Sequence, residues 1–312
     1  MAGSDLAARV AGGDVRALSR AIRMVEDGDP AVDEVVRALR GRGGAARTVG
    51  VTGPPGSGKS TLGDQLITRW RAAGRSVGVI AVDPSSPFSG GAILGDRVRM
   101  QRHATDSGVF IRSMAARGHL GGLASAAREA LRLLDASGRE CCLVETVGVG
   151  QSELEVMQTV DTVVVVTTPA SGDAVQISKA GILEIADIFV VNKADLPGAA
   201  KVYRDLKDLM RQTKAHAHWV PPVIQASGLE GTGIEELLAA IDHHHDTMGQ
   251  SGELEQRRRG RVRAEVESIV VERAARRARA ALAGAAMQQA LDGDVGAVDP
   301  YELAERILPG DG

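Results

Sequence analysis

The chain has 312 residues, 44% of them hydrophobic and 25% charged, a composition that excludes a largely disordered protein. Its 37 basic and 40 acidic residues give a net charge of −3, which argues against attraction to DNA or to an acidic membrane. Aromatic residues make up only 2%, which argues against a protein that stacks many bases or sugars.

The cysteines and the lack of a long apolar run indicate the compartment. Cys141 and Cys142 are the two cysteines and are adjacent, so they cannot build a disulfide framework and fit a reducing compartment. No basic segment leads into an apolar run near the first residues, and no apolar run approaches the roughly 20 residues that span a bilayer. We therefore expect a cytoplasmic protein whose partners are neither membranes nor nucleic acids.

The first 44 residues are predicted to form a helical extension. Apolar side chains recur at helical spacing from Leu6 to Val25, and a second apolar face follows Asp29-Pro30. The glycine-rich segment 41–44 ends this pattern, and a different kind of segment begins at about residue 45.

Residues 45–246 alternate between short apolar runs and helical stretches. The runs that we expect to be strands are Thr48–Thr52, Val77–Val82, Val109–Arg112, Cys141–Thr146, Thr162–Thr167, Ile188–Asn192 and Val223–Ala226. Several are apolar throughout, as is typical of parallel strands that are covered on both faces. This alternation predicts an α/β domain built on a doubly wound, mainly parallel sheet, with helical N- and C-terminal extensions.

Residues 247–312 are predicted to form a C-terminal helical arm. Its longest helical pattern, 253–283, carries a narrow apolar stripe at Val262, Val266, Ile269 and Val270. This stripe fits pairing with a second copy of the chain, and a solvated surface helix with a basic face is the alternative. The consecutive histidines 243–245 would point in different directions on a helix, so we interpret them as a polar helix end rather than as a metal site.

A phosphate-binding loop is predicted after the first strand. The segment that matches the P-loop pattern G-x-x-x-x-G-K-[ST] is Gly53-Pro54-Pro55-Gly56-Ser57-Gly58-Lys59-Ser60. Its glycines allow backbone N–H groups to surround phosphate oxygens, and the helix expected from Thr61 onward adds its positive N-terminal end. We predict that Gly53 through Thr61 bind the nucleotide, that Lys59 reaches the β- and γ-phosphates, and that the Ser60 hydroxyl binds Mg²⁺.

The base is predicted from a second motif. Asn192-Lys193-Ala194-Asp195 follows the strand at 188–191 and matches N-K-x-D. The Asp195 carboxylate can accept hydrogen bonds from N1–H and the 2-amino group of guanine, which adenine does not offer. We expect Lys193 to lie along the base and Asn192 to tie this loop to the P-loop. The segment Ala226-Ser227-Gly228, after the last strand, is expected to support the guanine O6 through its N–H groups.

Acidic residues after other strands are candidates for the metal and γ-phosphate side of the site. Glu145 and Gly148 occupy the place of the D-x-x-G element, so Glu145 is predicted to hold Mg²⁺ and the Gly148 N–H to bind the γ-phosphate. Asp83 ends the second strand and is a further metal candidate, with a turn residue before proline as the alternative. Asp96 is a candidate metal ligand or the N-cap of a helix.

The expected rate of hydrolysis depends on the residue after Gly148. Ras-like GTPases orient the attacking water with a Gln immediately after this element. That place is taken here by Val149, and Gln151 is displaced by two positions. We therefore expect slow hydrolysis by the protein alone, with a partner or a loop that completes the site.

Together these residues resemble the MeaB/ArgK family of P-loop GTPases, relatives of the methylmalonic aciduria type A protein. Beyond the P-loop and N-K-x-D, the most specific blocks are D-P-S-S-P at 83–87, L-G-D-R at 94–97 and E-T-V-G-V-G-Q-S-E at 145–153. The resemblance covers essentially the whole chain. The segment 171–176 departs from the G-D-E-L-Q pattern of the family, in a loop that the family links to partner-stimulated hydrolysis.

The resemblance implies more than spacing can show. It groups the chain with signal-recognition and metal-insertion GTPases, with Asp83, Asp96 and Glu145 as the Mg²⁺ and switch carboxylates. It also implies a homodimer held through the C-terminal arm, and a partner that is an adenosylcobalamin-dependent acyl-CoA mutase, most often methylmalonyl-CoA mutase. The GTPase would act as a chaperone that gates the loading and release of that cofactor.

Two other functions stay open at this point. One is a metal-insertion GTPase of the hydrogenase or urease type, which would need Cys or His ligands at metal spacing, and the sequence offers only the adjacent cysteines inside a predicted strand. The other is a kinase or transport ATPase, which N-K-x-D argues against.

Overall fold

The computed structural model describes residues 2–83, 101–115, 122–146, 148, 150–170, 182–213, 218–293 and 298–307. Asp96, Val149 and the segment 171–176 lie outside the described residues. The chain divides into two compact units, Met1–Arg259 and Gly260–Gly312. The division at residues 44 and 246 stays a prediction.

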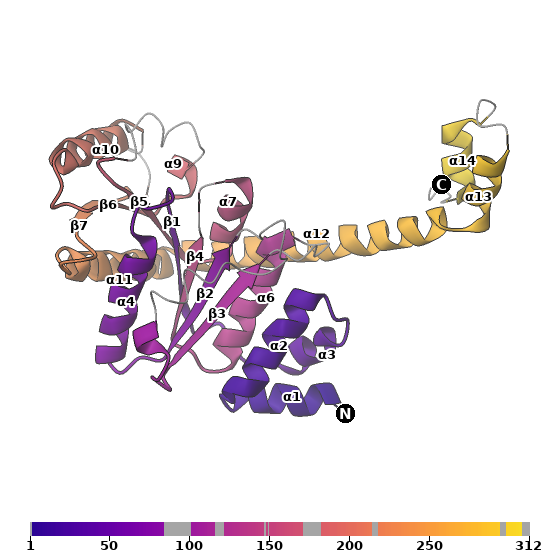
Figure 1. Cartoon of the computed structure of the whole chain (residues 1–312), viewed down its shortest axis with the longest axis horizontal. Helices are drawn as coiled ribbons and strands as arrows, with labels where there is room; N and C mark the ends of the chain where they lie inside the picture. Colours follow the sequence, from indigo (N-terminus) through magenta and orange to yellow (C-terminus); the bar gives the residue numbers. More distant parts are fainter. Residues whose placement is uncertain are drawn as a thin grey trace. The chain divides into compact units, whose positions relative to one another are not determined.

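The first unit is built on a seven-stranded sheet in the order β3-β2-β4-β1-β5-β6-β7 (Figure 1). The strands are β1 Arg47–Thr52, β2 Val77–Asp83, β3 Val109–Ala115, β4 Cys141–Thr146, β5 Thr162–Thr167, β6 Ile188–Asn192 and β7 Val223–Ala226. Every pair of neighbours is parallel, which confirms the predicted doubly wound α/β fold. Because β1 lies between β4 and β5, the loops that follow these three strands meet at one edge of the sheet, where α/β proteins bind ligands.

Strand β3 is longer than the sequence predicts. The apolar pattern stops at Arg112, but the strand continues to Ala115 and pairs with β2 along its whole length. Polar residues such as Ser113 are accepted there because β3 is an edge strand and is not covered as completely as the central strands.

Helices cover both faces of the sheet, as the apolar strands require (Figure 1). On one face, α4 (Lys59–Ala72) and α11 (Ile234–Ser251) share a core with Val49 and Val51 of β1. On the other face, the core contains residues of α6 (Gly122–Ala136), α7 (Gln151–Met157) and α10 (Ala199–Thr213). The short helix α9 (Ile182–Ile185) precedes β6, and the 3-10 helix η1 (Gln101–His103) precedes β3.

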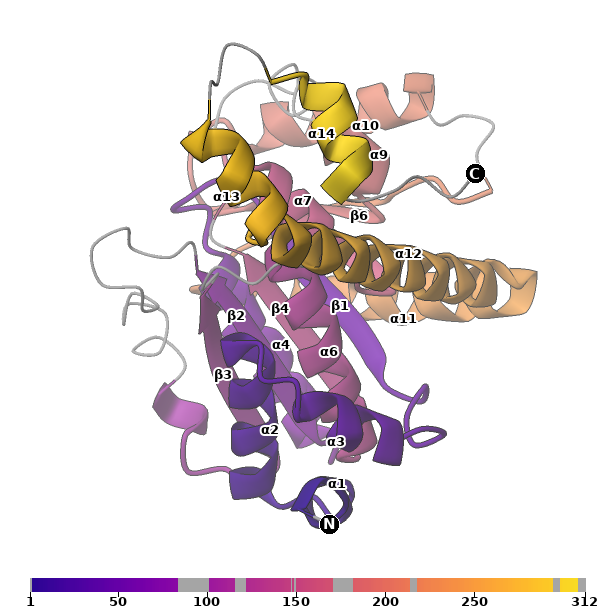
Figure 2. The ribbon, with the colours of Figure 1, turned by 90° about the vertical axis from the view of Figure 1, so that its right-hand side faces the viewer.

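The N-terminal helices α1 (Ala2–Ala11), α2 (Val15–Asp27) and α3 (Val32–Ala38) pack against α6 and extend its core (Figure 2). Asp14 caps α2 by accepting the N–H groups of Arg16 and Ala17 at 2.8 and 3.0 Å. Glu26 of α2 forms an ion pair with Arg112 of β3, which ties the N-terminal helices to the edge of the sheet.

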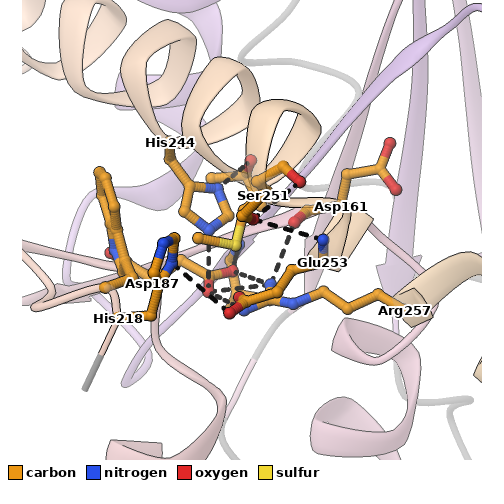
Figure 3. Close-up of polar contacts among 11 residues, drawn as sticks. Asp161, Asp187, His218, His244, Ser251, Glu253 and Arg257 are labelled. Atoms are coloured by element: carbon orange, nitrogen blue, oxygen red, sulfur yellow. Dashed lines mark hydrogen bonds and ion pairs between the residues drawn. The ribbon is translucent and has the colours of Figure 1, made fainter. Parts of the chain in front are cut away.

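A buried polar cluster joins α11, the first turns of α12 (Glu253–Leu282) and the amino ends of β5 and β6 (Figure 3). His244 is completely buried, with Nδ1 2.9 Å from Thr162 Oγ1 and Nε2 3.2 Å from Asp187 Oδ1. Arg257 approaches the same carboxylate at 3.0 Å, and the Val163 N–H donates to it at 2.8 Å. The interpretation of 243–245 as a polar helix end is therefore wrong, because α11 continues to Ser251 and the Asp187 carboxylate provides the buried His244 ring with a partner inside the fold.

The charge of Asp187 should stabilise the fold above about pH 4. Burial raises the pKa of this carboxyl, but the contact with His244, the Arg257 charge and the Val163 N–H together hold the pKa below its usual range. A lowered native pKa gives a stabilisation that is full above the unfolded value of about 3.9 and is lost as the pH falls through the native value. In urea unfolding at pH 7, we expect Asp187→Asn to cost about 3 kcal/mol, because it removes the buried negative charge that pairs with Arg257 and accepts the Val163 N–H.

The control for this prediction is Asp242→Asn on α11, which removes the half-exposed carboxylate that pairs with Arg47 of β1. It should change the free energy of unfolding by less than about 1 kcal/mol. Equal losses in the two variants would contradict the stabilising role of the buried cluster.

The second unit contains most of α12, followed by α13 (Ala285–Asp292) and α14 (Pro300–Ile307). Val262, Val266 and Val270 of α12 are more than half exposed at 55, 55 and 59%, so the predicted apolar stripe faces outward within this unit. Among the described helices, none is both long and apolar enough to cross a bilayer.

Candidate functional site

The P-loop motif lies where its chemistry requires, between the end of β1 at Thr52 and the start of α4 at Lys59. Gly53 and Gly58 have φ angles of 151° and 90°, and a Cβ would lie 2.1 Å from the Val166 carbonyl oxygen and 2.2 Å from Asn192 Nδ2, respectively. Only glycine fits both the backbone conformation and the space at these positions. The loop therefore packs closely against the ends of β5 and β6.

The Lys59 and Ser57 side chains lie inside this loop. The Lys59 ammonium is buried and donates to the carbonyl oxygens of Gly53 and Pro54 at 2.8 and 2.9 Å. The Ser57 hydroxyl is also buried, and its oxygen has no hydrogen-bond partner among the described residues. A cation and an unpaired hydroxyl in a loop of backbone N–H groups suit an oxygen-rich anion such as phosphate.

Ser60 and Glu145 lie next to each other, as a shared metal ion would require. The Ser60 hydroxyl donates to Glu145 Oε1 at 2.5 Å, and both side chains are buried. Hydroxyl and carboxylate oxygens are the ligands that Mg²⁺ prefers, so this pair fits the ion. Asp83 is the last residue of β2, which pairs with β4, so its backbone lies at the same edge of the sheet. The Asp83 side chain and the whole of Asp96 are not among the parts that the structure describes.

Gly148 is held beside the P-loop strand by two threonines. Thr52 Oγ1 donates to the Gly148 carbonyl oxygen at 2.9 Å, and Thr146 Oγ1 donates to Thr52 Oγ1 at 3.0 Å. Both threonines are completely buried. Sequence reasoning missed them, although a polar residue at the end of an otherwise apolar strand is a usable signal in parallel sheets.

Asn192 connects the three loops of the predicted guanine site. Its Nδ2 donates to the Ser57 carbonyl oxygen at 2.7 Å, which confirms the predicted tie to the P-loop. Its Oδ1 accepts the Gly228 N–H at 3.0 Å, and the Ala194 N–H donates to the Ala226 carbonyl oxygen, also at 3.0 Å. A buried amide that bonds to two other loops fixes the relative positions of these loops.

The remaining guanine-site residues lie on this scaffold. Lys193 adopts a left-handed conformation with φ 58°, and Asp195 is exposed two residues later. The Ser227 N–H donates to the Thr232 carbonyl oxygen at 3.1 Å, so the N–H groups of both Ser227 and Gly228 already have partners within the protein. Guanine O6 could accept from these N–H groups only in competition with the Thr232 carbonyl oxygen and Asn192 Oδ1.

Comparison with known proteins decides the family. The sequence model described as "Methylmalonyl Co-A mutase-associated GTPase MeaB" matches residues 18–283. The chain belongs to the MeaB family of GTPases. The P-loop, the N-K-x-D motif and the Ser60–Glu145 pair all lie within the part of this MeaB-family protein that the sequence model matches.

Relatives of this MeaB-family protein cover most of its length. A Pyrococcus horikoshii protein that is named as a GTPase is 47% identical over 309 residues, which span 97% of this chain and 96% of that one. GTPase ArgK of Escherichia coli is 38% identical over 258 residues, 80% of this chain and 77% of its own. A crystal structure described as LAO/AO transport system kinase is 27% identical, with a TM-score of 0.70 over 98% of this chain and 96% of that chain.

Proposed function

We propose that this MeaB-family GTPase binds GTP and GDP with Mg²⁺ and hydrolyses GTP to GDP and phosphate at the carboxyl edge of its sheet. Asn192 carries this proposal, because one buried side chain bonds both to the P-loop and to the loop after β7. The phosphate-binding and guanine-binding parts thus form one preorganised site. Preorganised polar groups are what GTP recognition requires.

Different residues bind the phosphates, Mg²⁺ and the base of the nucleotide. The P-loop N–H groups and Lys59 hold the phosphates, and the Gly148 N–H binds the γ-phosphate. Ser60 and Glu145, with Asp83 and Asp96, would hold Mg²⁺, which would supply positive charge to offset that of the phosphates. Lys193 and Asp195 read the base, with Ala226, Ser227 and Gly228 beside O6.

Hydrolysis by the protein alone is slow, and a partner stimulates it. Val149 supports this proposal, because its apolar side chain replaces the water-orienting Gln of Ras-like GTPases. Gln151 begins α7, after Gly150, and is the nearest candidate to take over that role.

The partner is an adenosylcobalamin-dependent acyl-CoA mutase, most simply methylmalonyl-CoA mutase, for which this protein acts as a chaperone of cofactor loading and reactivation. The family description, which names a mutase-associated GTPase, supports the proposal. The protein works as a homodimer through its C-terminal arm, and the exposed apolar stripe of α12 supports this pairing.

The partner is tested by pull-down from the native cytosol with the GTP-loaded protein. We expect an acyl-CoA mutase to be recovered and, when purified, to raise GTP turnover at least about tenfold. Recovery of a nickel enzyme without a mutase would favour the metal-insertion alternative instead. Among the described residues, there is no group of three or more His, Cys, Asp or Glu side chains that could hold a metal ion.

A further inference from the structure

Gln65 of α4 reaches the loop that follows β7. Its Nε2 donates to the Gly228 carbonyl oxygen at 2.9 Å. The Gly228 N–H donates to Asn192 Oδ1 at 3.0 Å. Two side chains from different elements therefore hold Gly228, one at its N–H and the other at its carbonyl group.

The orientation of the Gln65 amide is fixed by Arg69, one helical turn further along α4. Arg69 Nη1 lies 2.6 Å from Gln65 Oε1, and Arg69 Nε pairs with Glu235 of α11 at 2.7 Å. Because arginine can only donate, the oxygen of the Gln65 amide must face Arg69. Its NH₂ group is then directed at the Gly228 carbonyl oxygen.

The loop itself is tightly built around this contact. A Cβ at Gly228 would lie 3.2 Å from Thr61 Cγ2, so the loop packs closely against the first turn of α4. The Gly231 N–H donates to the Ser227 carbonyl oxygen at 2.7 Å. A loop with these internal bonds moves as a unit, and the Gln65 bond connects it to the P-loop helix.

We propose that Gln65 is a positioning residue for guanine recognition, which holds the loop 226–228 at the correct distance from the base read by Asp195. The inference rests on the proposed GTP site. Without the Gln65 donor, the loop keeps its bonds to Asn192 and Ala194 but loses its hydrogen bond to α4, and the base-binding end of the site loosens. Lys59 and Glu145, which are proposed to bind the phosphates and Mg²⁺ respectively, keep their own contacts.

Gln65→Met tests this role, because it keeps the length of the side chain and removes the donor. We expect the Kd for GDP and the KM for GTP to rise about tenfold, with kcat at saturating GTP changed less than twofold. The affinity for ATP, which does not use the guanine loop, should stay within twofold. The matched control is Gln212→Met on an exposed position of α10, which should leave every value unchanged.

Other outcomes separate the possible failures. Unchanged guanine affinity in Gln65→Met, or a parallel loss of GTP and ATP affinity, would overturn the positioning role. Failure of the unmodified protein to prefer GDP over ADP would instead remove the proposed GTP site. If Gln65→Met does not fold, Gln65→Glu keeps the size of the side chain and the partner of Arg69 while it lacks the donor, and it should show the same selective loss of guanine affinity.

Discussion

Asp195→Asn should lower the affinity for GTP at least about a hundredfold and create affinity for xanthosine triphosphate. A carboxylate can accept two hydrogen bonds from guanine, whereas an amide presents one acceptor and one donor. Xanthine carries a carbonyl group in place of the 2-amino group of guanine, so it matches the amide. Fluorescence titration with labelled GDP and xanthosine diphosphate measures the change in preference.

Asp208→Asn, on the exposed face of α10, is the control for this exchange and should bind GDP like the unmodified protein. Loss of both nucleotides in Asp195→Asn would indicate damage to the loop rather than a change of base. Retention of full GTP affinity would contradict the assignment of Asp195 as the base-reading residue.

Lys59→Met should reduce single-turnover GTP hydrolysis about a thousandfold. Methionine keeps much of the side-chain volume but removes the positive charge that stabilises the β- and γ-phosphate oxygens as the bond to the γ-phosphate breaks. The fold should persist, because a buried cation is replaced by an apolar group of similar size. Phosphate release and urea unfolding, measured on the same preparation, separate the two effects.

Lys207→Met provides the comparison, since this exposed lysine lies on α10 beside Tyr203. Its turnover should equal that of the unmodified protein. A Lys59→Met variant that hydrolyses GTP at a similar rate would exclude a phosphate-binding role for Lys59.

Local patterns predicted most of the fold and the motifs of the site. Central strands such as β4 and β5 are completely buried, and their continuous apolar runs are visible in the sequence. The P-loop and N-K-x-D motifs are equally local, because each consists of a few consecutive residues in one turn. A pattern within one short segment can be recognised without knowledge of its neighbours.

Contacts between distant segments could not be predicted in the same way. His244 is buried because Asp187 and Arg257 lie beside it, and nothing in the run of three histidines indicates which of them turns inward. The bond from Gln65 to Gly228 joins residues 163 positions apart, and Gln65 resembles any polar residue on a helix. The Thr52–Gly148 contact depends on the pairing of β1 with β4, which the sequence does not specify.

The strand order also has a consequence for synthesis on the ribosome. Strand β1, which leads into the P-loop, pairs with β4 and β5, so Val51 must wait for Glu145 and Val164 to be translated before it has neighbours on both sides. The bond from Asn192 to the P-loop spans 135 positions, and it too forms late. Sheets with pairings this distant fold slowly and leave apolar edges exposed in the nascent chain. Nucleotide is therefore expected to be captured only after most of the polypeptide has left the ribosome.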